Sequence, residues 1–145
     1  MTNEPVKILL VDDDEALRRM TLLFAKMAAP QAEFHEAGNV TQEKAKLAEH
    51  AFALMYTDNT MPGGMGMDLV HDTRTNPAIH QPKIIMATTD TGNVEEDAME
   101  AGVNVFLHKP FEPQKFINSI RELLATQSRA PVTAVPRPAV PTAGM

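Results

Sequence analysis

The chain has 145 residues, a formal net charge of −6 and no cysteine. The length suits one domain, the missing cysteine excludes disulfides and thiolate metal sites, and the acidic balance disfavours the basic face that sequence-independent nucleic-acid binding needs. No apolar run approaches the about 20 residues that cross a bilayer. We therefore expect a cytoplasmic monomer that binds neither nucleic acid nor membranes.

Short apolar runs alternate with segments of helical periodicity along the chain. In chain order the patterns predict a strand at 7–11, a helix from Asp14 or Glu15 to Ala28, a strand at 33–37, a helix at 41–50, a strand at 52–57, a helix at 67–73, a strand at 83–87, a helix at 94–101, a strand at 103–107 and a helix from Pro113 to about Thr126. Continuous apolar runs of this length are typical of parallel strands covered by helices. The strand at 33–37 is the weakest and is placed mainly because the alternation leaves a gap there.

Helix faces and ends follow from apolar spacing and capping residues. The apolar stripe predicted for the first helix consists of Leu17, Met20, Phe24 and Met27. The apolar side predicted for the second helix consists of Ala45, Leu47 and Ala48. Asn39 or Thr41 is the expected N-cap of the second helix, and Gly102 the expected left-handed C-cap of the fourth.

Five strand–helix units in strict alternation predict an α/β fold, a doubly wound five-stranded parallel sheet with helices on both faces. The flavodoxin-like strand order 2-1-3-4-5 is the expected winding, and ligands of such sheets sit at the carboxyl ends of the strands, where the order reverses. The composition changes after Gln127. We therefore expect a folded domain at 1–127 and a flexible Pro/Ala-rich tail at 128–145.

Acidic residues follow two strands that this order makes neighbours. The first strand ends at Asp12, Asp13 and Asp14, and the third ends at Asp58. Two carboxylates about 5 Å apart repel by roughly 3 kcal/mol at an effective dielectric near 20, so a cluster of three requires a cation. Oxygen ligands without cysteine or histidine favour Mg²⁺. The five histidines show no ligand spacing, so no metal site is predicted from them.

Helix capping is the simpler explanation for any one of these acids. It does not explain the set, because the fourth strand ends at Thr88 and the fifth leads to Lys109. A carboxylate can act as a nucleophile toward phosphorus, a lysine supplies a point charge for an anionic oxygen, and a threonine hydroxyl donates a hydrogen bond. The combination predicts phosphoryl transfer to Asp58 beside a metal ion.

Four motifs in this order resemble the receiver domains of bacterial two-component response regulators, especially single-domain CheY-like chemotaxis proteins. The resemblance covers about residues 7–124. Its motifs are the pair Asp12–Asp13, the spacing Asp58–Met61–Pro62–Gly66, the residue Thr88, and Lys109–Pro110–Phe111.

The resemblance implies a role for each matching residue. Asp58 would be the phosphoacceptor of a sensor histidine kinase, Asp13 and Asp58 would bind Mg²⁺ directly, Asp12 would help through water, and Thr60 would contribute its backbone carbonyl. Lys109 would precede a cis peptide bond to Pro110.

The same resemblance implies a switch. Thr88 would move toward the phosphoryl group, Phe106 would turn inward, and the surface of the fourth helix, fifth strand and fifth helix would change its affinity for a partner. Two positions depart from the commonest family pattern. Met65 precedes the loop glycine, where Asp or Asn is usual. Thr88 lies one residue closer to Lys109 than expected, which leaves Thr89 as the alternative switch hydroxyl.

Output through protein binding is the expected function, with the flagellar motor switch as the partner in chemotaxis and a phosphate sink or relay as the alternative. The protein is not expected to be a turnover enzyme. A haloacid-dehalogenase-type phosphatase would need a second acid where Thr60 stands, and a cap domain for which the chain has no room. A pseudo-receiver used only for docking would not need Asp12, Asp13, Asp58, Thr88 and Lys109.

Overall fold

The computed structural model describes residues 5–61, 64–89 and 93–128. The main sheet contains β1 (Lys7–Val11), β2 (Glu33–Ala37), β3 (Leu54–Asp58), β6 (Lys83–Thr88) and β7 (Val105–His108). The order is β2-β1-β3-β6-β7, with all four pairings parallel. The predicted fold class and strand order are therefore confirmed.

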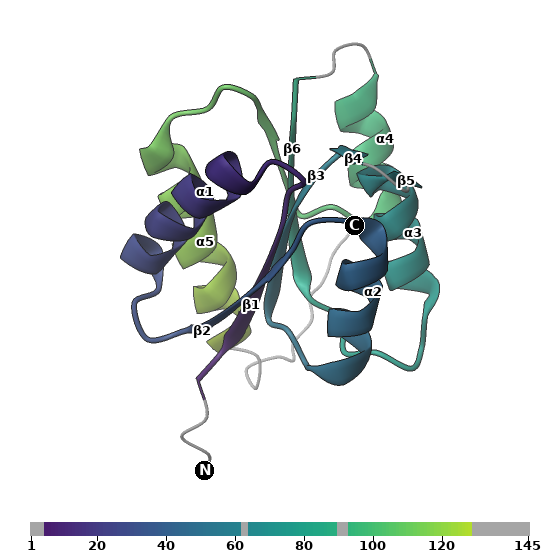
Figure 1. Ribbon diagram of the computed structural model, residues 1–145, viewed down its shortest axis with the longest axis horizontal. Coiled ribbons are helices and arrows are strands. Elements are labelled where there is room, and N and C mark those ends of the chain that lie inside the picture. Colours follow the sequence, from purple (N-terminus) through teal and green to yellow (C-terminus); the bar gives the residue numbers. More distant parts are fainter. Residues whose placement is uncertain (1–4, 62–63, 90–92, 129–145) are drawn as a thin grey trace, which may run out of the picture.

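Five helices cover the sheet in two layers. They are α1 (Glu15–Ala28), α2 (Val40–Glu49), α3 (Gly66–Thr75), α4 (Val94–Ala101) and α5 (Pro113–Ser128). Helices α1 and α5 lie on one face, and α2, α3 and α4 lie on the other (Figure 1). The alternation of side chains along each strand divides the core accordingly. In β1, Leu9 and Val11 join the core on the α2–α4 side, and Ile8 and Leu10 join the core beside α5.

Element ends differ from the sequence prediction by a few residues. β3 begins at Leu54, two residues later than predicted, although Ala53 already bonds to both neighbouring strands through its N–H to Lys7 and its carbonyl from Lys83, each at 2.9 Å. β7 also begins two residues late, because the Val103 N–H bonds back to Ala98 at the end of α4. Asn39 is the N-cap of α2, and its side chain accepts from the Gln42 N–H at 2.8 Å.

One small element was not predicted. Strands β4 (Thr60–Met61) and β5 (Gly64–Met65) form a two-stranded antiparallel sheet directly before α3. The predicted loop between the third strand and third helix therefore contains a short hairpin.

The predicted apolar faces of the first two helices are wrong in part. Leu17, Met20 and Met27 are exposed, and α1 instead buries Thr21 and Ala25. In α2, Ala45 and Ala48 are exposed, and Leu47 is buried together with Glu43. In both helices small or polar side chains, namely Thr21, Ala25 and Glu43, occupy buried positions, so the spacing of the larger apolar residues does not locate the buried face.

Among the described residues, no helix is both long enough and apolar enough for a bilayer crossing. Residues 129–145 lie outside the described part of the chain, so the flexible tail stays a prediction.

The side chain of Arg74, in the last turn of α3, connects that helix to the segments that precede β6 and β7. Its guanidinium donates to the carbonyl of Gly102 at 3.0 and 2.8 Å and to that of Pro82 at 2.8 Å. Gly102 is the predicted left-handed C-cap of α4, with φ 117°, and a Cβ there would lie 2.7 Å from Arg74 Cγ. Burial lowers the pKa of Arg74, because partial removal from water disfavours the charged guanidinium.

We expect Arg74→Met to lower the free energy of unfolding by about 3 kcal/mol, because it leaves half-buried carbonyls without their charged donor. Urea denaturation checks this value. Arg19→Met is the matched control, since Arg19 is mostly exposed and its ion pair with Glu15 lies within one helix, an interaction worth less than about 0.5 kcal/mol. Equal losses in the two variants would contradict the structural role of Arg74.

Candidate functional site

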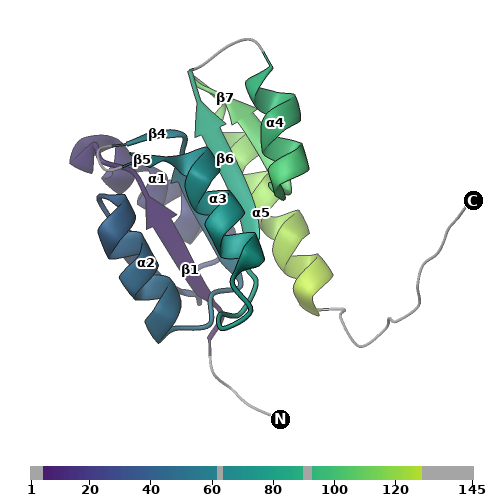
Figure 2. The same ribbon diagram turned by 90° about the vertical axis from the view of Figure 1, so that its right-hand side faces the viewer.

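The carboxyl ends of four strands bring the predicted site residues to one edge of the sheet. Asp12 directly follows β1, Asp58 ends β3, Thr88 ends β6, and Lys109 directly follows β7. The strands run in one direction, so these ends share one side of the molecule (Figure 2). β1 and β3 are neighbours, although a helix and the whole of β2 separate them in sequence.

The ammonium group of Lys109 lies between two carboxylates. Its Nζ is 3.6 Å from Asp12 Oδ2 and 3.7 Å from Asp58 Oδ1. The Asp12 side chain is 2% exposed, that of Asp58 15% and that of Lys109 18%. At this degree of burial water screens the charges only partly, so the lysine holds the two acids at a short separation.

Three carboxylates converge in a way that suits a hard cation. Asp12, Asp13 and Asp58 each offer an oxygen within 4.8 Å of the other two. Asp12 Oδ1 accepts from the Asp14 N–H at 3.0 Å, but among the described residues Asp12 Oδ2 has no hydrogen-bond partner, and Lys109 Nζ lies 3.6 Å from it. A buried carboxylate oxygen that has an ion pair but no hydrogen bond is stabilised further by a bound cation. The oxygen-only donor set therefore fits Mg²⁺.

Helix capping accounts for only one acid of the cluster. Asp14 is the N-cap of α1, and its Oδ1 accepts from the Leu17 N–H at 3.1 Å. Asp12 and Asp13 precede the cap, and among the described residues neither accepts a hydrogen bond from the N–H groups of the first helical turn. The capping explanation therefore fails for the two residues that matter to the site.

Tyr56 lies behind the acidic cluster. It is almost fully buried on β3, with its ring edge-on to Phe116 of α5 at 5.4 Å. Burial, and then the negative charges of Asp12 and Asp58, raise the pKa of the Tyr56 phenol. It is the sole tyrosine of a chain that has no tryptophan, so its fluorescence reports on this site alone.

A pocket of about 300 Å³ opens over the acids. Both Thr88 and Thr89 line it with Lys109. Thr88 is buried at the end of β6 and Thr89 is exposed, so both hydroxyl residues border the space in which a phosphoryl group would sit.

Phe106 lies on the same face of the sheet as Thr88. It pairs with Met86 in the register of β6 and β7, and Thr88 pairs with His108. The Phe106 ring is half-buried and packs edge-on against His108 at 5.1 Å. His108 in turn lies 3.4 Å from Glu95 in the first turn of α4. Thr88 is thus linked to the α4 surface through neighbouring side chains.

Gly66 positions the loop after Asp58. A Cβ at Gly66 would overlap the backbone oxygen of Asp58 and approach Asn59 Cα to 2.9 Å. Only glycine permits this close approach. The Gly66 N–H donates to the Asn59 carbonyl at 2.5 Å, and the buried Asn59 side chain accepts from the Met67 N–H at 2.9 Å.

Two residues that hold the backbone around the acidic cluster were not predicted from the sequence. One is Asn59; its only signal was a polar residue placed next to a candidate nucleophile. The other is Arg18, which donates to the Asp12 carbonyl at 2.7 Å and to Glu36 Oε1 at 2.9 Å. Arg18 fixes the backbone that carries the acids, but nothing in the local pattern of α1 identifies it.

The remaining predicted residues divide into described and undescribed positions. The peptide bond from Lys109 to Pro110 is cis, as the resemblance implied. The backbone of Thr60, in β4, pairs with that of Met65 in β5. Pro62 lies outside the described residues.

Known proteins resemble the chain along most of its length. The family described as "Response regulator receiver domain" matches residues 8–121. "Chemotaxis protein CheY1" of Helicobacter pylori is 32% identical over 123 residues, which are 83% of this chain and 98% of that protein.

Two solved structures resemble it as well. A CheY-like response regulator receiver domain protein from Methanospirillum hungatei has a TM-score of 0.76 at 25% identity, over 87% of this chain and 98% of that one. Chemotaxis response regulator CheY4 of Vibrio cholerae has a TM-score of 0.72 at 25% identity, over 82% and 98%.

Proposed function

The chain belongs to the response regulator receiver family and acts in phosphorelay signalling, and on that basis we propose that Asp58 is its phosphoacceptor. The observation that carries the proposal is the position of the Asp58 carboxylate, 3.7 Å from Lys109 Nζ and beside the carboxylates of Asp12 and Asp13. Receiver domains bind Mg²⁺ at an acidic pocket of this kind, and they are not classical turnover enzymes.

The proposed roles follow from charge and position. Asp12, Asp13 and Asp58, with the Thr60 carbonyl, would hold Mg²⁺, which when bound neutralises charge that develops on the phosphoryl oxygens. Lys109 offers a fixed positive charge at 3.7 Å from Asp58 Oδ1 for another of those oxygens. Thr88, or Thr89 beside it, would donate a hydrogen bond to the third.

The proposed step is an in-line transfer. A carboxylate oxygen of Asp58 attacks the phosphorus of a phosphohistidine, the new O–P bond forms as the P–N bond breaks, and the donor imidazole leaves with the electron pair and takes up a proton. The direct test is labelling with Mg²⁺ and a small acyl phosphate such as acetyl phosphate. One phosphoryl group labile to hydroxylamine is expected, and a chain that takes up none would overturn the proposal.

The proposed output is a change at the surface of α4, β7 and α5. Thr88 and Phe106 lie on one face of the sheet, and the contact of His108 with Glu95 continues that face to α4. We propose chemotaxis as the setting, supported by the names of relatives such as CheY1 of Helicobacter pylori, with the flagellar motor switch as the downstream partner. A phosphate sink or relay without motor contact is the alternative. Binding of the phosphorylated chain to a motor switch protein distinguishes the two.

The phosphodonor domain of a sensor histidine kinase is the proposed upstream partner, and an apolar surface beside the acids suits it. Helix α1 exposes Leu17, Met20, Leu23 and Met27. A largely apolar pocket of about 400 Å³, lined by Met20 and Phe111 among others, reaches Asp12 and Lys109. A protein donor must bring its histidine to Asp58, so it has to cover the surface that borders this pocket.

We expect Met20→Gln to slow phosphotransfer from a phosphorylated kinase domain about tenfold, because it removes apolar contact area at the centre of this surface. Labelling by acetyl phosphate should stay unchanged, since that donor is too small to reach α1. Met99→Gln on α4, with a side chain of similar exposure, is the matched control and should behave as wild type with both donors. Parallel losses with both donors would rule out a docking role for Met20.

A further inference from the structure

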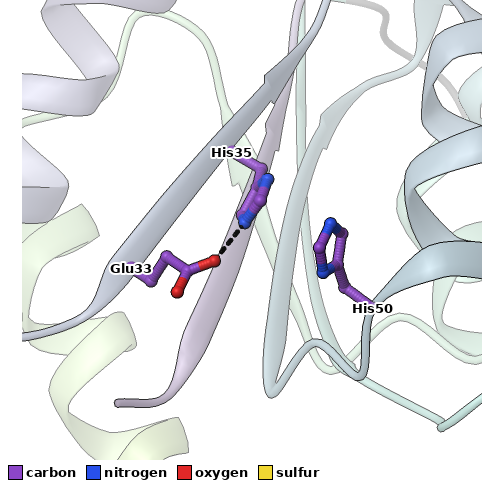
Figure 3. A group of neighbouring side chains, drawn as sticks. All are labelled: Glu33, His35 and His50. Carbon is purple, nitrogen blue, oxygen red and sulfur yellow. Dashed lines mark hydrogen bonds and ion pairs between the residues drawn. The ribbon is translucent and has the colours of Figure 1, made fainter. Parts of the chain in front are cut away.

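Three potential metal ligands meet away from the acidic cluster, between the edge strand β2 and the end of α2. Glu33 and His35 are two residues apart on β2 and therefore point to the same face of the strand. His50 is the C-cap residue of α2. A carboxylate oxygen of Glu33 and a ring nitrogen of each histidine lie within 4.8 Å of one another. In the view of Figure 3, the His35 ring lies between the carboxylate of Glu33 and the ring of His50.

Contacts around the group hold its members in place. His35 Nε2 lies 2.6 Å from Glu33 Oε2, and this hydrogen bond holds the pKa of Glu33 below its ordinary value. The two histidine rings are tilted at a centroid distance of 4.4 Å. Fully buried Phe52 stands edge-on to both, at 5.3 and 5.7 Å. The group therefore has an apolar base, like many protein metal sites.

The opposite side of the group is open. The side chains of Glu33, His50 and His35 are 42%, 28% and 14% exposed. Two oppositely charged residues border the group: Lys46 Nζ is 3.2 Å from His35 Nδ1, and Glu49 Oε1 is 3.9 Å from His50 Nε2. A bond from the Lys46 ammonium to Nδ1 leaves the ring proton on Nε2, directed at Glu33. That proton occupies the place where a cation would bind both groups.

We propose that Glu33, His35 and His50 form a second metal site, for Zn²⁺ or a divalent transition metal of similar chemistry. Imidazole suits Zn²⁺, Cu²⁺ and Ni²⁺, whereas Mg²⁺ selects oxygen ligands such as those of the acidic cluster. Two histidines and one carboxylate are a known zinc set that leaves a fourth position open. Glu49 is close enough to supply that position.

The geometry needs only a small adjustment. Ligand atoms at zinc distances of about 2.0–2.2 Å stand about 3.3 Å apart around a tetrahedral ion. The ligand atoms already lie within 4.8 Å of one another, and the partly exposed side chains of Glu33 and His50 have room to rotate toward that spacing. The bound ion would cross-link the edge strand to α2 and stabilise this side of the sheet, so the proposal concerns a site separate from phosphoryl transfer.

Ring-nitrogen NMR of the full chain during a Zn²⁺ titration tests the proposal, with excess Mg²⁺ present to occupy the acidic cluster. One equivalent should shift the ring nitrogens of His35 and His50, should leave those of His71, His80 and His108 unchanged, and should raise the melting temperature. EDTA should reverse both effects. Equal shifts in all five histidines, or shifts restricted to the amides near Asp12 and Asp58, would refute a site here.

Variants separate ligation from folding. His50→Gln and Glu33→Gln should each weaken Zn²⁺ binding at least about tenfold, and His80→Gln, an exposed control, should not. The half-exposed position of Glu33 on an edge strand makes its variant the safer one to fold. If both ligand variants bind Zn²⁺ as wild type does, the assignment is wrong. Acetyl phosphate labelling of either variant should equal that of wild type, so failure of this proposal leaves the phosphoacceptor role intact.

Discussion

Asp58→Asn is expected to abolish phosphorylation by acetyl phosphate in Mg²⁺, a loss of at least about a thousandfold in labelling rate. The amide lacks the charge and nucleophilicity of the carboxylate, and no other acid occupies its position at the end of β3. Asp12 is nearly inaccessible at 2% exposure, and Asp13 is exposed at the rim. Intact-protein mass spectrometry and sensitivity of the label to hydroxylamine measure the result.

Asp14→Asn is the matched control, because Asp14 belongs to the same run of acids but serves as the N-cap of α1. Asparagine caps a helix as well as aspartate does, so labelling should persist. Tyr56 fluorescence checks that both variants keep the buried environment next to the acids. Label that remains in Asp58→Asn at the wild-type rate would mean that another side chain is the acceptor.

The fold was predictable because its signals are repeated along the chain. Each buried strand is a run such as Lys7–Val11, and each is followed by a helix, so errors at single ends left the winding unchanged. The ends of the strands were less predictable, because a residue next to a strand can make similar hydrogen bonds. Ala53 bonds to both neighbours of β3 without belonging to the strand. The hairpin of β4 and β5 is too short for a two-residue period to be visible.

The acidic cluster was predictable for a different reason. Parallel strands deliver their last residues to one edge, so the topology alone brought Asp12, Asp58 and Lys109 together. Side-chain contacts between elements that are separate in sequence were not predictable. Arg18 reaches the Asp12 carbonyl across the start of α1, and His35 meets His50 only because β2 and α2 pack together. Such contacts depend on side-chain direction in three dimensions, which sequence spacing does not report.

Glu43 shows the same limit in the core. It occupies an apolar position of α2, one turn before Leu47, and its side chain is fully buried. In the part of the chain that the structure describes, neither of its carboxylate oxygens has a hydrogen-bond partner. Burial raises the pKa of Glu43 from 4.5 to about 8, against the opposing effect of the Lys44 charge. The folded chain therefore keeps Glu43 protonated at neutral pH, whereas the unfolded chain ionises it.

This difference makes folding stability depend on pH. Between pH 4.5 and about 8 the folded state binds a proton that the unfolded state has lost, so the free energy of unfolding falls as pH rises through this window. At about 1.4 kcal/mol for each pH unit, the contribution of Glu43 that is present below pH 4.5 and lost by about pH 8 is on the order of 5 kcal/mol.

Glu43→Gln is expected to remove this dependence, because the amide stays neutral at every pH. Urea denaturation at pH 5 and pH 8.5 should give similar stabilities for variant and wild type at the lower pH. At the higher pH the variant should be more stable by a few kcal/mol. Glu100→Gln, an exposed change on α4, should follow the wild-type pH profile and so corrects for all other titrating groups. If the free energies of unfolding of Glu43→Gln and wild type differ by the same amount from pH 5 to pH 8.5, the prediction is wrong. Glu43 would then already be ionised in the folded protein.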